Sequence, residues 1–334
     1  MATIYSNYSN AQLYELFRAE NWHSDKMNDV QRQQALQELS DRDALASGTR
    51  KCPVEVSGST NPYGAYNHGT GKISLNDEFV NKGTNCKDPY HSPIRAANLR
   101  AMNTIYHENR HSWQHELVER PPREGDDLQL RSDLAANFHG SNYIRPSADT
   151  DVYDLYRIQV CEKDANEAGE AKTMAAMKEL EPYHNGQTDP NMGQYAGQIS
   201  RSYQDSLERA RIRYDDPHVE QTLQRAMNDN AFHDRAIPEN QRDSYYRIRT
   251  LMARQEIDDY EKYMKAHPNL DEELRSEYEK VVEMRTQEIE SLQKANEQSL
   301  ANANGAGQNS QHPNPAGNGQ DDWDEDGEWN GLGM

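Results

Sequence analysis

One segment constrains the fold more than any other, because it has the ends and the apolar spacing of a single long helix. Ser92 is a good helix N-cap and Pro93 suits the first helical position, while Pro121 and Pro122 stop the segment. The apolar positions between these ends are Ile94, Ala97, Ala101, Met102, Ile105 and Leu117. The sequence therefore predicts a helix that passes through a hydrophobic core.

The predicted helix carries His107, Glu108 and His111 in the pattern His-Glu-x-x-His. Residues four apart share one face of a helix, so the two imidazoles are able to point at one metal ion. Glu108 lies about 100° around the helix, where it reaches a water on that metal without binding the metal itself. This pattern predicts a Zn2+ site in which Glu108 is the general base of a hydrolysis.

A catalytic zinc usually takes three protein ligands, and the strongest candidate for the third is Glu162. It lies in a second predicted helix, some 50 residues after His111. Asn166 follows four residues later on the same face and is placed to orient a ligand imidazole. Between them, the small Ala165 allows this helix to pack closely on the metal helix. The predicted ligands are therefore His107, His111 and Glu162.

Other residues remain candidates for the third ligand and for a further role in hydrolysis. His115 lies one turn beyond His111, although three ligands spaced by four residues on one helix rarely converge on one ion. The remaining candidates for the third ligand are His139, Asp149, Asp151 and Glu167. A hydrolysis also needs a donor to its developing oxyanion, and Tyr143, Tyr153 and Tyr156 precede Glu162. Packing in the core is the more common role of such tyrosines.

Shorter patterns predict the other elements. Helical periodicity marks residues 11–20 and 26–46, and Gly48 follows the second helix as a C-cap. Alternation over residues 52–57 predicts a strand, and residues 64–76 read as a β-hairpin. Further helices are expected over 127–138, from 152 to about 180, and throughout 198–300 with breaks near 216–217, 236–239 and 266–269.

The motif and the segment around Glu162 together resemble a known family. His-Glu-x-x-His followed by a helical Glu-x-x-Ala-Asn resembles the gluzincin metallopeptidases, and the second segment is also similar to that of compact ImmA/IrrE-like bacterial peptidases. The stretch from Gly64 to Asn76, which ends in Ile73-Ser74-Leu75-Asn76, resembles the hairpin and edge strand that precede the metal helix in minimal zincins. The resemblance covers residues 50–180. It implies a bacterial or phage zincin whose edge strand binds an extended peptide by strand addition.

The expected fold class is α+β, with a small antiparallel sheet and active-site helices in a minimal zincin-like domain. An all-helical region and a disordered, Asn/Gly-rich, acidic tail are expected to follow it. The expected units are residues 1–48 as N-terminal helices packed on the zincin domain, 49–197 as the zincin-like domain, 198–300 as the helical accessory region and 301–334 as the tail.

Composition narrows the choice of partners and compartment. The net charge of −20 over 334 residues repels phosphate backbones and anionic lipids, which argues against nucleic acid and membrane partners. No signal peptide or transmembrane run is visible, and three cysteines without close pairing suit a reducing compartment. The sequence therefore predicts a cytoplasmic location, with unconventional export left open.

The sequence supports three hypotheses about function. The first is a zinc metalloendopeptidase that hydrolyses peptide bonds in a protein or peptide substrate. The second is a catalytically inactive zincin-like binding or regulatory protein, because Asn109 and Arg110 stand where zincins usually have apolar and small residues. On this reading the helical region or the acidic tail binds a partner. The third is a helical interaction protein whose motif arose by chance, which predicts no bound zinc.

Overall fold

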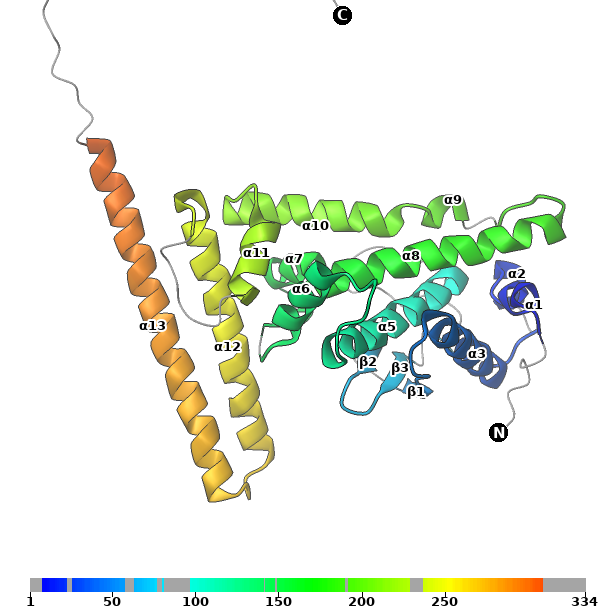
Figure 1. Ribbon diagram of the computed structural model, residues 1–334, viewed down its shortest axis with the longest axis horizontal. Coiled ribbons are helices and arrows are strands. Elements are labelled where there is room, and N and C mark those ends of the chain that lie inside the picture. Colours follow the sequence, from blue (N-terminus) through cyan, green and yellow to red (C-terminus); the bar gives the residue numbers. More distant parts are fainter. Residues whose placement is uncertain are drawn as a thin grey trace, which may run out of the picture.

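The computed structural model describes residues 8–22, 26–57, 63–76, 80, 97–140, 142–147, 149–189, 192–228 and 237–308. Most of these residues are helical, and three short strands form one sheet, so the predicted α+β class is confirmed. The sheet is mixed and not antiparallel as expected, because its first strand runs parallel to the central one. Figure 1 shows the sheet on one side of α5 and the long helix α8 on the other, with α10 beyond α8. Among the described residues, no helix combines the length and apolar character needed to cross a membrane.

The sheet contains β1 (Val54–Ser57), β2 (Gly64–Asn67) and β3 (Lys72–Asn76) in the order β1-β3-β2. The predicted hairpin is confirmed, since β2 pairs antiparallel with β3, and β1 joins β3 in parallel. The resemblance placed an edge strand at the end of this hairpin. In the structure β3 is instead the central strand, and β2 is the edge strand beside α5.

Helix α5 (Ala97–Glu119) is the predicted metal helix and ends before Pro121 as expected. The predicted start at Ser92 and Pro93 lies outside the described residues. The buried side chains of the helix contribute to the main hydrophobic core, together with residues of β1, β3, α3 and the end of α8. The packing of this core therefore holds the polar residues of α5 that lie next to it in fixed positions.

The N-terminal helices pack against this core. α3 (Asp29–Ser47) begins at an Asn28 capping box and ends at Gly48, which has a φ of +67°, so the predicted C-cap is confirmed. The single helix predicted over 11–20 is instead two short helices, α1 (Asn10–Glu15) and α2 (Ala19–Trp22). The turn between them lets the fully buried rings of Phe17 and Trp22 stack 5.1 Å apart.

The helix predicted from Val152 to Leu180 is two helices, α7 (Thr150–Ile158) and α8 (Val160–Leu180). Gln159 between them is extended, with ψ of 149°. Its side chain accepts hydrogen bonds from the Ile144 amide and the Asn137 side chain, and donates one to the Ile144 carbonyl. Local periodicity cannot reveal this break, because its hydrogen-bond partners come from distant parts of the chain.

Close contact between α8 and α5 depends on two small residues of α8. Ala165 is fully buried, and Gly169 lies four residues later on the same face. A Cβ on Gly169 would lie 2.6 Å from Asn103 Nδ2 of α5, which is too close for any larger residue without a shift. These two positions bring the start of α8 within reach of the motif on α5.

The bounds of the remaining helices are α6 Leu128–Phe138, η1 Glu181–His184, α9 Met192–Tyr195, α10 Gln198–Tyr214, α11 Val219–Asn228, η3 Glu239–Gln241, α12 Arg242–Ala266 and α13 Glu272–Gln308. Of these, α10, α11, α12 and α13 form a second hydrophobic core with α7, while α6 contributes to a small third core and α9 to the main one. α12 and α13 make an antiparallel hairpin at one end of the molecule (Figure 1). The helix α13 extends past residue 300, where the tail was expected to begin, and residues 309–334 lie outside the described part.

Candidate metal centre

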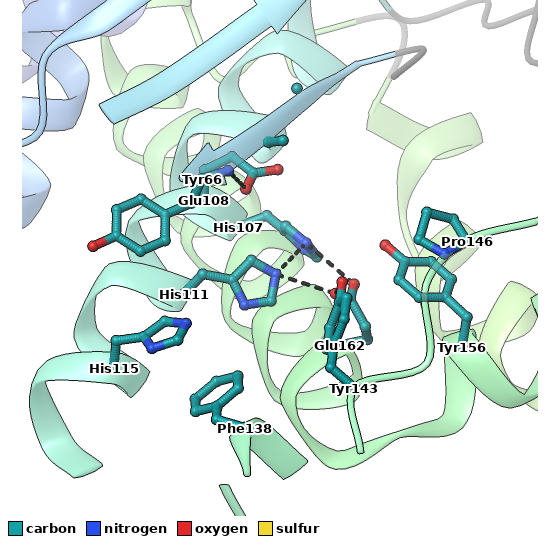
Figure 2. Close-up of a pocket in the computed structure, with 12 residues that line it drawn as sticks. Tyr66, His107, Glu108, His111, His115, Phe138, Tyr143, Pro146, Tyr156 and Glu162 are labelled. Carbon is teal, nitrogen blue, oxygen red and sulfur yellow. Dashed lines mark hydrogen bonds and ion pairs between the residues drawn. The ribbon is translucent and has the colours of Figure 1, made fainter. Parts of the chain in front are cut away.

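The three predicted ligands meet in one cleft. His107 and His111 come from α5, and Glu162 comes from the first turn of α8 (Figure 2). The two Nε2 atoms are 3.0 Å apart, His107 Nε2 is 3.5 Å from Glu162 Oε2, and His111 Nε2 is 3.4 Å from Glu162 Oε1. Two helices that are separate in sequence thus bring two imidazoles and a carboxylate to one point.

This cluster of two imidazoles and a carboxylate suits Zn2+. With zinc bonds of about 2.0–2.2 Å, tetrahedral geometry places ligand atoms roughly 3.3–3.5 Å apart. The contacts of 3.5 and 3.4 Å with Glu162 lie in that range, each to a different carboxylate oxygen, and the two Nε2 atoms at 3.0 Å lie slightly closer together. Glu162 Oε2 is also buried without a hydrogen-bond partner among the described residues, and a buried carboxylate oxygen of this kind is costly unless a cation compensates it.

The surroundings of Glu162 keep its carboxylate ionised. Burial opposes the charge, but the charge of His111 and the close approach of both imidazoles hold the pKa of Glu162 well below its ordinary value. The start of α8 adds the positive end of a helix dipole. Tyr143 donates a 2.8 Å hydrogen bond to Glu162 Oε1, and burial and Glu162 raise the pKa of that phenol well above its ordinary value. Tyr143, one of the candidate oxyanion donors, therefore has its hydroxyl directed at the predicted ligand Glu162.

A proton competes with zinc for His111. Burial lowers its pKa, but Glu162 outweighs burial and raises the pKa of His111 to about 9. Zinc needs the neutral imidazole, so the proton must leave when the metal binds. Below pH 9 the protonated ring resists zinc, and affinity rises as the pH rises toward 9.

We therefore expect zinc affinity to increase about tenfold between pH 7 and pH 8. A ligand histidine with an ordinary pKa near 6.5 would give less than about a twofold increase over the same interval. Competition titrations against a chromophoric chelator at the two pH values measure this difference. A nearly constant affinity would show that Glu162 does not hold a proton on His111.

A hydrogen-bond chain fixes the orientation of His111. Gln114 Oε1 accepts a 2.8 Å hydrogen bond from His111 Nδ1, so the Nε2 of the neutral ring carries the free lone pair. The Gln114 amide donates to the Cys161 carbonyl and to Asp164 Oδ2. Arg110 forms a bidentate pair with Asp164, with contacts of 2.7 and 2.9 Å, and its guanidinium lies 3.6 Å from the Trp113 ring centroid.

Asn109 and Arg110, the two unusual residues within the motif, both have structural partners. Asn109 contacts α3, since it accepts a hydrogen bond from Ser40 Oγ and donates to Asp43 Oδ2. Arg110 joins α5 to α8 through the Asp164 pair. Both polar side chains are therefore compatible with the packing of the motif helix.

Gln114 is not among the residues predicted from the sequence, although residues three apart on a helix, such as His111 and Gln114, are neighbours. Replacing Gln114 with Met keeps its length and removes its hydrogen bonds. We expect this change to weaken zinc binding by about 10–100-fold, as is typical when the partner of a ligand imidazole is lost. The same titration measures the effect, and the exposed Gln129→Met on α6 is the control. Equal affinities for both variants would contradict the orienting role.

Glu108 is held beside the ligands by the edge strand. Its carboxylate is buried, and Oε2 accepts a 2.7 Å hydrogen bond from the Tyr66 amide of β2. This contact requires β2 to lie close to α5: a Cβ on Gly64 would be 3.0 Å from Thr104 Cγ2 and 2.9 Å from Leu75 Cδ2. Among the described residues Oε1 makes no hydrogen bond that would prevent it from receiving a proton.

Donor atoms of His107, Glu108 and His111 also lie within 4.8 Å of one another. Glu162 is the better third ligand, because it approaches both Nε2 atoms while Glu108 is bonded to the strand. With Glu162 as the third ligand, Glu108 remains free to take a proton from a water, which is the role that the sequence predicts for it.

A second cluster, His68, His115 and Glu119, also brings possible ligand atoms within 4.8 Å. The rings of His68 and His115 stack face to face, with centroids 4.1 Å apart and planes 16° from parallel. A metal ion lies in the plane of each imidazole that binds it, and one ion cannot lie in two stacked planes. The arrangement is therefore an aromatic stack, which Phe138 extends on the other face of His115 at 4.0 Å.

The other candidates have different roles. His139 caps the end of α6, Asp149 caps the start of α7, Asp151 pairs with Arg213, and Glu167 is exposed. Asn166, predicted to orient an imidazole, instead donates to the Glu162 backbone carbonyl and accepts a hydrogen bond from Arg157. Tyr156 lines the cleft, and Tyr153 packs beside it with ring centroids 6.0 Å apart.

A comparison of the chain with family models, curated proteins and solved structures finds no match in any of the three. The chemistry of the cleft follows from its own residues. These are two imidazoles and a carboxylate that suit zinc, and a buried glutamate between them and an edge strand.

Proposed function

We propose that this protein is a zinc-dependent metallopeptidase that hydrolyses peptide bonds in a protein substrate. The observation that carries the proposal is the convergence of His107, His111 and Glu162 from two helices, with Glu108 beside them and bonded to β2. If the motif had arisen by chance, there would be no reason for a buried carboxylate from a distant part of the chain to lie beside its two histidines. The ionised Glu162 and the oriented His111 both suit a divalent cation.

The residues of the cleft have different roles in the proposed hydrolysis. His107, His111 and Glu162 would hold Zn2+, which supplies a Lewis acid for the water and the substrate carbonyl. Glu108 Oε1 accepts a proton from the water and passes it to the leaving amine. Tyr156 lines the cleft on the side of Glu162, and its phenol, which is protonated at neutral pH, would be a donor for the oxyanion.

The edge strand offers a place for the substrate backbone. Gly64, Ala65 and Tyr66 of β2 line the cleft beside Glu108. Among the described strands β2 pairs only with β3, so its outer edge, apart from the Tyr66 amide that donates to Glu108, has backbone groups for an extended peptide. Strand addition along that edge would carry a peptide bond past the metal centre.

The test is cleavage of a proteome-derived peptide library by the purified protein, read by mass spectrometry of new termini. We expect cleavage by the zinc-loaded protein, loss of cleavage with a zinc chelator, and recovery when zinc is restored. Cleavage that resists the chelator would indicate another mechanism or a contaminant. A zinc-loaded protein that cleaves no member of the library would favour the alternative of an inactive binding protein.

A further inference from the structure

One segment without helix or strand, residues 142–147, joins the metal centre to the second hydrophobic core. Tyr143 and Pro146 of this segment line the cleft on the side of Glu162 (Figure 2). The Tyr143 hydroxyl donates to Glu162 Oε1, whereas Oε2 is buried without a hydrogen-bond partner among the described residues. The position of Tyr143 therefore bears on which oxygen of the carboxylate is left for a metal ion.

The other side of the segment is anchored in helices that lie outside the cleft. Ile144 is fully buried in the second core, which α10, α11, α12 and α13 form with α7. The buried side chain of Asn142 donates 2.8 Å hydrogen bonds to the Met227 carbonyl of α11 and to the Ala136 carbonyl of α6. Neighbouring residues of one short segment thus contact the metal centre and the second core.

Further contacts fix the backbone of the segment at both sides. Arg145 pairs with Asp259 of α12 and donates a 3.3 Å hydrogen bond to the Gln255 carbonyl of the same helix. The backbone amide and carbonyl of Ile144 both bond to the side chain of Gln159, just before α8. The segment therefore lies between the start of α8, which carries the predicted ligand Glu162, and the helices α11 and α12.

We infer that α11 and α12 position the metal centre through this segment, with Asn142 and Arg145 as positioning residues that act through Tyr143. This inference rests on the proposed function, because it concerns the zinc site of the proposed peptidase. A phenol that donates to a ligand carboxylate fixes how the carboxylate faces the ion, and loss of such a partner typically costs about 10–100-fold in metal affinity. The helices after residue 198 are on this account a support of the zinc site.

The test is a double-mutant cycle on zinc affinity, measured by chelator competition. Tyr143→Phe keeps the ring and removes the hydroxyl, and we expect it to weaken zinc binding by at least about tenfold. Asn142→Leu keeps the approximate shape and removes both hydrogen bonds, and we expect a loss of similar size. The double variant should bind zinc within about twofold of Tyr143→Phe, because Asn142 acts through the hydroxyl that is already lost.

Two more variants separate positioning from a general loss of stability. Thr222→Val on α11 removes a buried hydrogen bond to Asp216 that no residue of the segment shares, and it should keep the wild-type affinity. Arg145→Ala removes an exposed side chain, so it decides the question if Asn142→Leu does not fold. We expect it to weaken zinc binding by about twofold to fivefold, because exposed ion pairs contribute little, and to have no effect in Tyr143→Phe.

Each result has one meaning. Wild-type affinity in Tyr143→Phe, in a folded Asn142→Leu, or in Arg145→Ala where Asn142→Leu does not fold, would overturn the inference. Losses that multiply in the double variant, or an equal loss in Thr222→Val, would also overturn it, because they indicate an effect of the core as a whole. A wild type that binds no zinc would contradict the proposed function and the inference with it. Since the cycle measures zinc binding, a zinc-loaded wild type that cleaves no peptide would contradict the proposed function alone.

Discussion

Glu108→Gln is expected to lower the rate of peptide hydrolysis by about 10²–10⁴-fold, the usual contribution of a general base. Glutamine keeps the shape of the side chain, and its amide oxygen is still able to accept the hydrogen bond from Tyr66. The amide nitrogen cannot take up the proton of the water. Initial rates on the library peptides that the wild type cleaves measure the change.

The zinc content of this variant distinguishes loss of the base from loss of the site. Glu108 is not among the proposed ligands, so Glu108→Gln should bind as much zinc as the wild type. Glu119→Gln, at an exposed position of the same helix, is the matched control and should keep its rate. A Glu108→Gln protein that hydrolyses peptides at the wild-type rate would refute the assigned mechanism.

Glu162→Ala is expected to weaken zinc binding by more than about 100-fold. Loss of a residue that only orients a ligand costs about 10–100-fold, and loss of the ligand itself should cost more. The change also removes the anion that offsets the charge of the ion in a buried site. Plasma mass spectrometry of the purified protein and chelator competition give the zinc content and the affinity.

Two further variants make this result specific. His111→Ala should lose zinc to a similar extent, because it removes another of the three proposed ligands. Glu167→Ala lies on the same helix at an exposed position and should retain zinc. Zinc lost from His111→Ala but retained by Glu162→Ala would move the third ligand to another residue.

Much of the local architecture follows from the sequence. The capping residue Gly48, the hairpin over 64–76, the helix over 127–138 and the break at 266–269 are present as predicted. These features depend on residues close together in the chain, such as turn residues and apolar periodicity. The pair of histidines on α5 follows in the same way, from a spacing of four on one helix.

Other features depend on contacts between distant segments. The break at Gln159 is made by hydrogen bonds to Ile144 and Asn137, and it sets Glu162 in the first turn of a new helix. Gln114, in place of the predicted Asn166, contacts the His111 ring. The sequence alone does not show which of Gln114 and Asn166 contacts the His111 ring, because that contact depends on how α5 and α8 pack.

The sequence by itself determined which side chains are candidates to bind a metal ion and to activate a water. The spacing of His107, Glu108 and His111 on one helix fixes their directions, and Glu162 was predicted from the type and position of its side chain. Only the tertiary structure decided the 3.4–3.5 Å approach of Glu162, the hydrogen bond from Tyr66 to Glu108 and the stacking of His115 between His68 and Phe138. The physical reason is that spacing along a helix fixes a direction, whereas a distance between elements is fixed by packing.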